Sequence, residues 1–354
     1  MTRTQGGHTG VATTPAWAWG MLPLRFVQGW IYWGGGSRRF IYAPAKLNAW
    51  GGGHWMAYKF QTAMPGALFG LDHVISYMLQ HFALLYGGVI LFSLFELVVG
   101  LMLIAGLATR LAALGSIALS FVLMLMFGWQ GATCIDEWTM AACNFAMGMA
   151  LFFAGGGAYS CDALWRQRRP SISAHPAYDW CLGDRSLPLA EQPLRRLALF
   201  ATALTVLFVV GTYDHYRGSV YSAFHPGPVS PTHHHWSLRS AQLASDGAVR
   251  FHAYVDAGTP EAASQVLRIR LRDASGRLYE VWSGDELAHL PASSYVNDYA
   301  YQKIHRGPFG IIGPVGAKAW IRLPGHLDQP LPQGHYVLSL AAVDGQVWRL
   351  DLQR

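Results

Sequence analysis

Long apolar runs separated by short polar links make up the first 213 residues of the chain. A membrane-spanning helix needs about 20 mostly apolar residues. Five stretches meet that requirement, at residues 17–35, 83–107, 111–128, 138–156 and 195–213. The pattern therefore predicts an N-terminal α-helical transmembrane bundle of about five spans.

A different pattern begins beyond the last of these stretches, where hydrophobic and polar residues alternate one by one. Val249, Phe251 and Ala253 would share one face of an extended chain, and a period of two is typical of half-buried strands. Asp344-Gly345 lies between two such runs and is a strong hairpin signal. We expect an all-β, sandwich-like antiparallel domain of about seven strands.

Composition divides the chain at the same place. Residues 1–213 hold 13 Lys/Arg and 8 Asp/Glu, whereas the shorter stretch 214–354 holds 13 and 12. The chain as a whole is 13% charged, against roughly 25% in soluble domains. We therefore predict a helical domain over 1–213, a stiff Pro/His-rich linker over 214–235 and a β-rich domain over 236–354.

The short links between the apolar stretches predict an orientation, because Lys and Arg near span ends stay in the cytoplasm. The second link holds Arg110 and the fourth is rich in arginine, while the third, GWQGATCIDEW, has no cation. The N-terminus would then be cytoplasmic, and the first loop (36–82) and the β domain would be outside. The first apolar stretch lacks the features of a cleaved signal peptide. We expect a multi-pass protein of a bacterial inner membrane with a periplasmic C-terminal domain.

Several classes of function are not supported by the composition and motifs of the sequence. The sequence pI is about 9.2, yet the cations are dispersed, with no basic helix of the kind that follows nucleic acid. The four cysteines match no zinc spacing. The three consecutive histidines His233, His234 and His235 could not all face one ion from a strand. We predict neither nucleic-acid binding nor a metal site.

The first loop carries an unexpected group of cations for the cation-poor side of a membrane. They are Arg38, Arg39, Lys46 and Lys59, with His54 near them. Each one alone is readily explained as part of a solvated face, since long loops translocate with little regard to charge. Together they form a candidate anion-attracting mouth.

Ionisable residues within a span are functional candidates by default. Arg25 lies about 12 Å from the inner end of the first span, and Glu96 about 16 Å from the inner end of the second, at 1.5 Å per residue. These depths would allow the two to pair. The pair would either fix helix packing or form a proton or quinone head-group site.

Two cysteines fall at the outer face, Cys134 in the third link and Cys143 in the first turns of the fourth span, with Asp136 and Glu137 beside them. A disulfide needs Cα atoms within about 7 Å, which this spacing permits without requiring it. A structural bridge, two buried small side chains and a redox-active pair all remain open.

The run FELVVGLMLIAGLATRLAAL resembles the second-helix signature of the DoxX/DoxD superfamily, and LRFVQGWIYWGGG resembles its first helix. GPFGIIGP and VGAKAWIRLP look like the DoxA subunit. This order is similar to fused thiosulfate:quinone oxidoreductases. The resemblance implies oxidation of thiosulfate to tetrathionate outside the cytoplasm, a membrane quinone as electron acceptor, and no haem. The resemblance leaves open whether the chain forms a homo-oligomer or associates with a terminal quinol oxidase.

Two enzyme mechanisms follow from the residues. Thiosulfate could attack an oxidised Cys134–Cys143 pair, with Asp136 or Glu137 moving protons. Alternatively, the first-loop cations could hold two thiosulfates while electrons pass directly to quinone. A different class of function also remains, a non-catalytic membrane subunit of a larger oxidase or transport complex.

Overall fold

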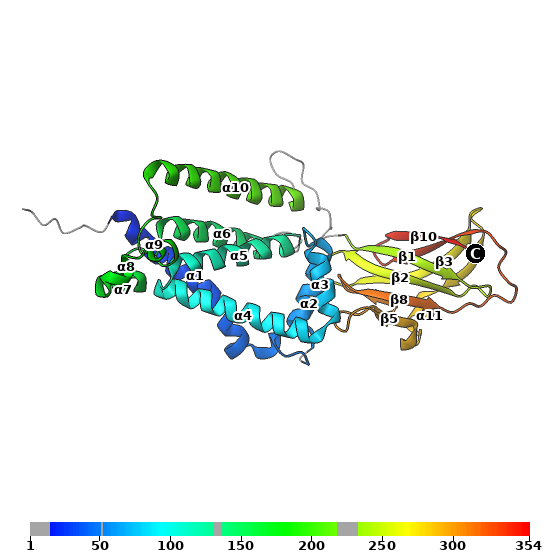
Figure 1. Ribbon diagram of the computed structural model, residues 1–354. Coiled ribbons are helices and arrows are strands. Elements are labelled where there is room, and N and C mark those ends of the chain that lie inside the picture. Colours follow the sequence, from blue (N-terminus) through cyan, green and yellow to red (C-terminus); the bar gives the residue numbers. More distant parts are fainter. Residues whose placement is uncertain (1–14, 51, 130–135, 218–232) are drawn as a thin grey trace, which may run out of the picture. The chain divides into compact units, whose positions relative to one another are not determined.

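The computed structural model describes residues 15–50, 52–129, 136–217 and 233–354. Helices form in all five apolar stretches, as the hydrophobic pattern predicts (Figure 1). They are α1 (Ala16–Ser37), α4 (Phe82–Ala105), α5 (Thr109–Phe127), α6 (Asp136–Ala154) and α10 (Glu191–Arg217).

Three helices of the described chain are long and apolar enough to cross a membrane: Phe82–Ala105, Thr109–Phe127 and Glu191–Tyr216. α1 and α6 are outside this set. α1 contains Arg25, Gln28 and several glycines, and α6 begins with two acidic residues, all of which lower hydropathy. The prediction of five helices is confirmed, and that of five membrane crossings stays a prediction.

The segment between α1 and α4, treated above as a long loop, is largely helical. Its amphipathic helix α3 buries Ile75 and Leu79 while Val74 and Tyr77 stay exposed, which explains why the segment lacks the long apolar run of a span. Its elements are η1 (Arg38–Tyr42), η2 (Pro44–Lys46), η3 (Gly52–His54), α2 (Met56–Ala63), η4 (Met64–Gly66) and α3 (Leu71–Gln80). The arginine-rich link before α10 forms α7 (Cys161–Arg168), α8 (Pro170–Ser173) and α9 (Pro176–Cys181).

The chain divides into two compact units. The first unit comprises Met1–Tyr42, Leu91–Phe121 and Ala141–Val206, and the second comprises Ala43–Ile90, Val122–Met140 and Leu207–Arg354. The described residues of the first unit form helices and their links, without a strand. The second combines helices α2 and α3 with the whole β domain.

The β domain consists of two antiparallel sheets with strand orders β1-β2-β8-β5 and β10-β9-β3-β7-β6, with β4 also pairing β3. Its described part contains ten strands instead of about seven, because β5, β6 and β7 are only three or four residues long. The strands are β1 (His235–Leu243), β2 (Val249–Ala257), β3 (Ser264–Asp273), β4 (Leu278–Trp282), β5 (Tyr295–Asn297), β6 (His305–Gly307), β7 (Gly310–Gly313), β8 (Lys318–Leu323), β9 (His335–Ala342) and β10 (Val347–Gln353), with α11 (Gly284–Ala288) and η5 (Ala292–Ser294) between them.

The alternation predicted for β2 is confirmed. Val249, Phe251 and Ala253 are at most 1% exposed, and the residues between them face outward. The predicted hairpin also forms, with Gly345 at φ +84° between β9 and β10, a left-handed conformation that glycine adopts without strain. The β domain therefore follows its sequence pattern closely.

Asp162 holds the start of α5 in the first unit. Its carboxylate accepts hydrogen bonds from the backbone N–H groups of Ala108 (2.8 Å) and Thr109 (2.9 Å) and from the Thr109 hydroxyl (2.9 Å). The side chain is buried, and burial raises the pKa of Asp162 above its ordinary value while the three hydrogen bonds oppose that rise. Asp162 thus acts as a helix cap supplied from a distant segment.

Replacement of Asp162 by alanine is expected to destabilise the first unit by about 2 kcal/mol, since two buried N–H groups lose their acceptor. The measurement is the thermal midpoint of the detergent-solubilised protein. Asp328→Ala, at an exposed carboxylate of the β domain, is the control and should leave the midpoint unchanged. Equal midpoints for the two variants would contradict the capping role.

Candidate functional site

A buried glutamine of helix α2 forms hydrogen bonds to the β domain. The Gln61 amide nitrogen donates to the carbonyls of Gln302 (2.8 Å) and Gly316 (3.0 Å), and its oxygen accepts from the Gln302 N–H (2.9 Å). Gly316 has φ +85°, and a Cβ there would lie 2.0 Å from the Gln61 carbonyl oxygen. Only glycine allows this close approach, so backbone and side chain together hold α2 against the β domain.

A second contact joins α3 to the same domain. The hydroxyls of Ser76 and Tyr299 are 2.7 Å apart, and Tyr299 is 3% exposed within an apolar cluster that includes Met64 and Ile75. Burial raises the pKa of Tyr299, which keeps its hydroxyl protonated as a donor. The helical segment and the β domain therefore form one packed body within the second unit.

A cavity of about 290 Å³ lies between these elements. Its volume is near the lower end of the roughly 300–1,000 Å³ typical of small-ligand sites. Its wall comes from η4 and α3 on one side and from β1, β2 and β8 on the other. The lining residues are Met64, Pro65, Asp72, His73, Ser76, Ser237, Arg239, His252, Tyr254 and Lys318. We call it the junction pocket.

Two cations line the junction pocket, Arg239 and Lys318, and neither forms an ion pair with any residue that the structure describes. The nearby carboxylates have other partners. Asp298 lies 3.0 Å from His252 and Asp72 lies 3.8 Å from His73. Asp256 accepts a hydrogen bond from Ser237 and lies 2.6 Å from His235. The lining therefore holds two cations, Arg239 and Lys318, against one carboxylate, Asp72, which leaves an excess of positive charge.

Lys318 is held by aromatic rings in place of a carboxylate. Its ammonium lies 4.3 Å from the ring centre of Tyr254 and 5.9 Å from that of Tyr299. Burial lowers the pKa of Lys318, and the nearby charge of Arg239 adds to that effect while Asp298 and Asp72 oppose it. An anion bound between Lys318 and Arg239 would relieve both the desolvation and the repulsion. The pocket is thus chemically suited to a small anion.

A second candidate site lies in the first unit. Glu96 on α4 and Arg39 in η1, directly after α1, form an ion pair of 2.5 Å, with both side chains 13% exposed. The Arg39 guanidinium is also 5.8 Å from the Phe92 ring. A Cβ at Gly35 would lie 2.1 Å from a Glu96 carboxylate oxygen, so glycine at that position makes room for the acid.

This arrangement corrects the expected pairing of Arg25 with Glu96. The Arg25 guanidinium, 2% exposed, donates instead to the carbonyls of Gly156 (2.6 Å) and Tyr159 (3.2 Å). The reason is helix register, which similar depths along two helices do not determine. A Cβ at Gly100 would come within 2.5 Å of α1 backbone, and such close contacts between glycines set the offset of α1 against α4.

Polar side chains continue through the interior of the first unit as a chain of hydrogen bonds. The Gln28 amide nitrogen donates to the Ser116 hydroxyl (2.6 Å), which lies 3.1 Å from the Tyr32 hydroxyl. Tyr32 in turn lies 2.9 Å from the Ser120 hydroxyl. All four side chains are buried. Buried polar groups between apolar helices are costly unless hydrogen-bonded to one another, and linked hydroxyls can pass protons.

Models of known protein families match most of the chain. The model described as "TQO small subunit DoxD" matches residues 20–189, and the model described as "TQO small subunit DoxA" matches residues 216–351. TQO denotes thiosulfate:quinone oxidoreductase. The chain is a DoxD domain fused to a DoxA domain. The fused order expected from the sequence motifs is confirmed.

The junction pocket draws residues from both domains. The DoxD domain contributes Asp72, His73 and Ser76, and the DoxA domain contributes Arg239 and Lys318, among others. Neither domain alone contains the complete wall. The pocket therefore exists because the two are joined in one packed body.

The residues expected to hold thiosulfate are divided between the units. Arg38 and Arg39 belong to the first unit, and Lys46, His54 and Lys59 belong to the second. Arg39 already pairs with Glu96, and Lys59 pairs with Glu137 at 2.6 Å. Their role in binding stays a prediction. Lys318 and Arg239 escaped the sequence analysis because they are outward positions on separate strands, and only strand register brings them together.

The cysteine proposal rests partly on residues outside the described chain. Cys134 lies there, as does the side chain of Asp136, whereas Cys143 is an exposed residue of α6. Glu137 is the partner of Lys59. The predicted redox pair and its proton carriers thus remain a hypothesis for experiment.

Proposed function

We propose that this chain is a thiosulfate:quinone oxidoreductase that oxidises two thiosulfates to one tetrathionate and passes two electrons to a membrane quinone. The observation that carries the proposal is the junction pocket, where Arg239 and Lys318 face a cavity of ligand size without a carboxylate partner among the described residues. Thiosulfate is a small dianion, and two cations match its charge. The DoxD and DoxA matches supply the reaction class.

In the proposed binding step, Lys318 and Arg239 hold the sulfonate oxygens of thiosulfate and leave its terminal sulfur free to react. Two electrons leave as the sulfur–sulfur bond of tetrathionate forms. In one route the terminal sulfur attacks an oxidised Cys134–Cys143 bond and releases one cysteine thiolate. A second thiosulfate then displaces the other thiolate and gives tetrathionate, and the two thiolates pass two electrons to quinone as their disulfide re-forms. In the other route electrons reach quinone without a covalent adduct.

Quinone reduction consumes two protons, and the Arg39–Glu96 pair with the hydrogen-bonded hydroxyls of the first unit is the proposed source. A carboxylate on a span-length helix is costly, and its position beside a partly buried arginine suits a group that gains and loses a proton. The same pair can serve as a packing element, and variants at Arg39 and Glu96 separate the two roles.

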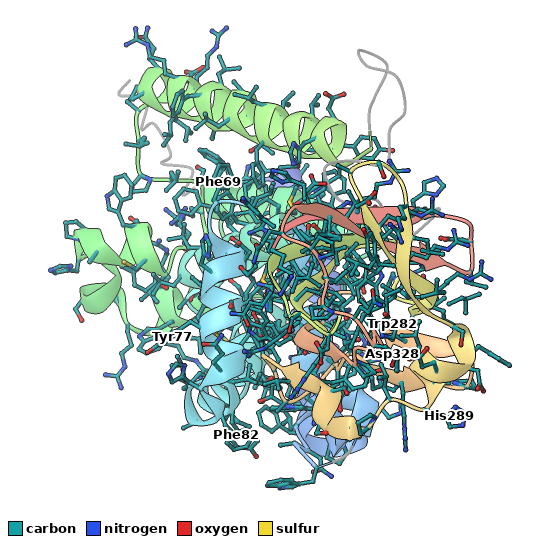
Figure 2. The ribbon with its side chains drawn as sticks, turned by 90° about the vertical axis from the view of Figure 1, so that its right-hand side faces the viewer. Phe69, Tyr77, Phe82, Trp282, His289 and Asp328 are labelled. Atoms are coloured by element: carbon teal, nitrogen blue, oxygen red, sulfur yellow. The ribbon has the colours of Figure 1, made fainter. Side chains whose placement is uncertain are left out.

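For the membrane, we propose a bacterial inner membrane with the N-terminus in the cytoplasm and the DoxA domain in the periplasm. Exposed aromatic residues support a position of the α2–α3 segment at a membrane interface, where such side chains collect. Trp50 is 90% exposed and Phe69 is 84% exposed. Tyr77 and Phe82 also point outward from the protein (Figure 2).

The deciding experiment is thiosulfate-dependent reduction of a soluble quinone by the purified full chain. Quinone reduction and tetrathionate formation in equal amounts would support the proposal. The family models describe subunits of a complex. Absence of turnover from the chain alone, with turnover restored by a partner subunit, would favour the alternative of a non-catalytic membrane subunit.

The covalent route predicts that Cys134→Ser or Cys143→Ser abolishes turnover while leaving thiosulfate binding intact, because a serine hydroxyl cannot form the mixed disulfide. Cys161→Ser and Cys181→Ser provide matched controls at the remaining cysteines and should keep full activity. Normal turnover in both test variants would exclude the covalent route and leave the direct one.

A further inference from the structure

Cations line the outward face of the four-stranded sheet well beyond the junction pocket. Because β2 and β8 pair in register, Tyr254 lies opposite Lys318, His252 opposite Trp320, and Arg250 opposite Arg322. Directly opposed residues project from the same face of an antiparallel pair. The face therefore continues from the junction pocket through the His252 and Trp320 rings, whose centres are 5.2 Å apart, to two arginines.

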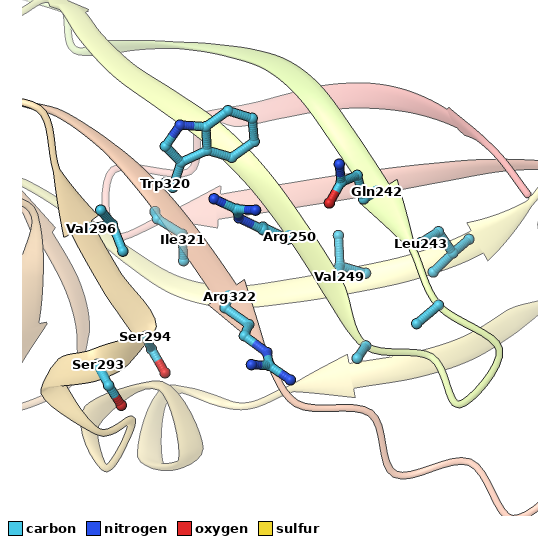
Figure 3. Close-up of a pocket in the computed structure, with 12 residues that line it drawn as sticks. Gln242, Leu243, Val249, Arg250, Ser293, Ser294, Val296, Trp320, Ile321 and Arg322 are labelled. Carbon is cyan, nitrogen blue, oxygen red and sulfur yellow. The ribbon is translucent and has the colours of Figure 1, made fainter.

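These two arginines border a groove of about 470 Å³. Figure 3 shows it with Arg250, Arg322, Trp320 and the hydroxyls of Ser293 and Ser294 along its walls. The groove has no acidic residue in its lining. The lining residues are Gln242, Leu243, Ala244, Ala248, Val249, Arg250, Ser293, Ser294, Val296, Trp320, Ile321 and Arg322.

Like charges directly opposite each other on neighbouring strands destabilise a sheet. Neither Arg250 nor Arg322 has an ion pair within the described part of the chain. The Arg250 guanidinium lies 4.5 Å from the Trp320 ring centre. In Figure 3 the Arg322 side chain points away from that ring. A doubly charged anion between them would turn this repulsion into attraction. Both side chains are exposed, so they can rotate toward it at small cost.

We propose that the groove is a second binding site for the dianionic substrate, in which Arg250 and Arg322 hold the sulfonate oxygens and the hydroxyls of Ser293 and Ser294 donate hydrogen bonds. The site captures thiosulfate from solvent and delivers it along the cationic face, past His252, to the junction pocket. Rows of one charge sign raise association rates in this way. The identity of the anion rests on the proposed function, whereas the presence of an anion site does not.

The test is titration calorimetry of thiosulfate into the full chain in detergent, without quinone. Wild type should bind two equivalents, and the double variant Arg250→Gln/Arg322→Gln should bind one. Arg268→Gln/Arg349→Gln removes the same charge from exposed positions of the other sheet and should keep both equivalents. The proposal would be overturned if the test variant still bound two equivalents of thiosulfate, or if the control variant also lost one equivalent.

Competition identifies the ligand. Tetrathionate carries the same sulfonate groups and should displace thiosulfate from the groove, whereas sulfate lacks the sulfur chain and should displace it only at much higher concentration. Displacement by sulfate at equal concentration would show a general dianion site and overturn the assignment to substrate. These measurements do not depend on turnover, so failure of the proposed function would be seen separately.

Kinetics provide the readout for delivery. The double variant should show kcat/KM for thiosulfate lowered about 10-fold at low ionic strength, with unchanged kcat, and the difference should vanish at high salt. The matched control should follow wild type at every salt concentration. A decrease in kcat/KM that is the same at low and high salt in the test variant would contradict delivery along the cationic face.

Discussion

Replacing Lys318 by methionine is expected to raise the KM for thiosulfate about 10- to 100-fold with a smaller change in kcat. A hydrogen bond to a charged group contributes about 1.5–3 kcal/mol, and each 1.4 kcal/mol is a factor of ten in affinity. Methionine keeps the apolar stem that packs on Tyr254 and removes only the charge. A loss confined to KM indicates an interaction made equally in the ground state and the transition state.

The control for this variant is Lys303→Met, which removes an exposed lysine of the same domain. It should leave KM unchanged. Lys318→Arg keeps the charge and should recover part of the affinity. An unchanged KM in a folded Lys318→Met protein would remove the junction pocket from the proposal, whatever the thermal midpoint.

The same site has an expected pH dependence. Burial lowers the pKa of Lys318 in the free protein, and a bound dianion raises it again because it stabilises the ammonium. Thiosulfate affinity is therefore fully present below the pKa of the free protein and is lost as pH rises through it. The alkaline limb of log(kcat/KM) should move or disappear in Lys318→Met and should persist in Lys303→Met.

Glu96→Gln is expected to lower kcat by about 10²- to 10⁴-fold, the usual contribution of a positioned acid or base. KM for thiosulfate should stay near its normal value, since Glu96 does not line the junction pocket. Glutamine has nearly the same shape and can still accept a hydrogen bond from Arg39, but it cannot exchange a proton. The measurement is steady-state quinone reduction with its pH profile.

A structural ion pair would give a different set of results. Removing one partner of a buried pair commonly costs 3–5 kcal/mol because the other charge is left unpaired. The double variant Arg39→Gln/Glu96→Gln has no such charge and should recover the thermal midpoint. Proton transfer predicts that activity stays low in this stable double variant. Activity that returns together with stability would assign the pair to packing alone.

The local pattern of hydrophobic, polar and turn residues was sufficient to predict most of the architecture. The five apolar stretches form helices, and the period of two in β2 places Val249, Phe251 and Ala253 in the core. The Asp344-Gly345 turn joins β9 and β10. These features depend on neighbours in sequence, through hydrogen bonds and burial within one element. A single sequence therefore contains the information needed to predict them.

Long-range register accounts for what the sequence analysis missed. Glu96 pairs with Arg39 and not with Arg25, because close contacts at Gly29 and Gly100 set how α1 lies against α4. The segment 36–82 proved helical and contributes a wall of the junction pocket. A hydrophobic pattern gives the face that a helix buries, but it does not say which level of a neighbouring helix that face meets.

By itself, the sequence determined two domains of different solvent preference, their order as DoxD followed by DoxA, and the class of reaction that this order implies. Only the tertiary structure decided where positive charge gathers. Arg239 and Lys318 are 79 positions apart in the printed sequence, and Arg250 and Arg322 are brought opposite each other by the pairing of β2 with β8. Charge–charge interactions act through space, so a basic site assembled from separate strands becomes visible only when their register is known.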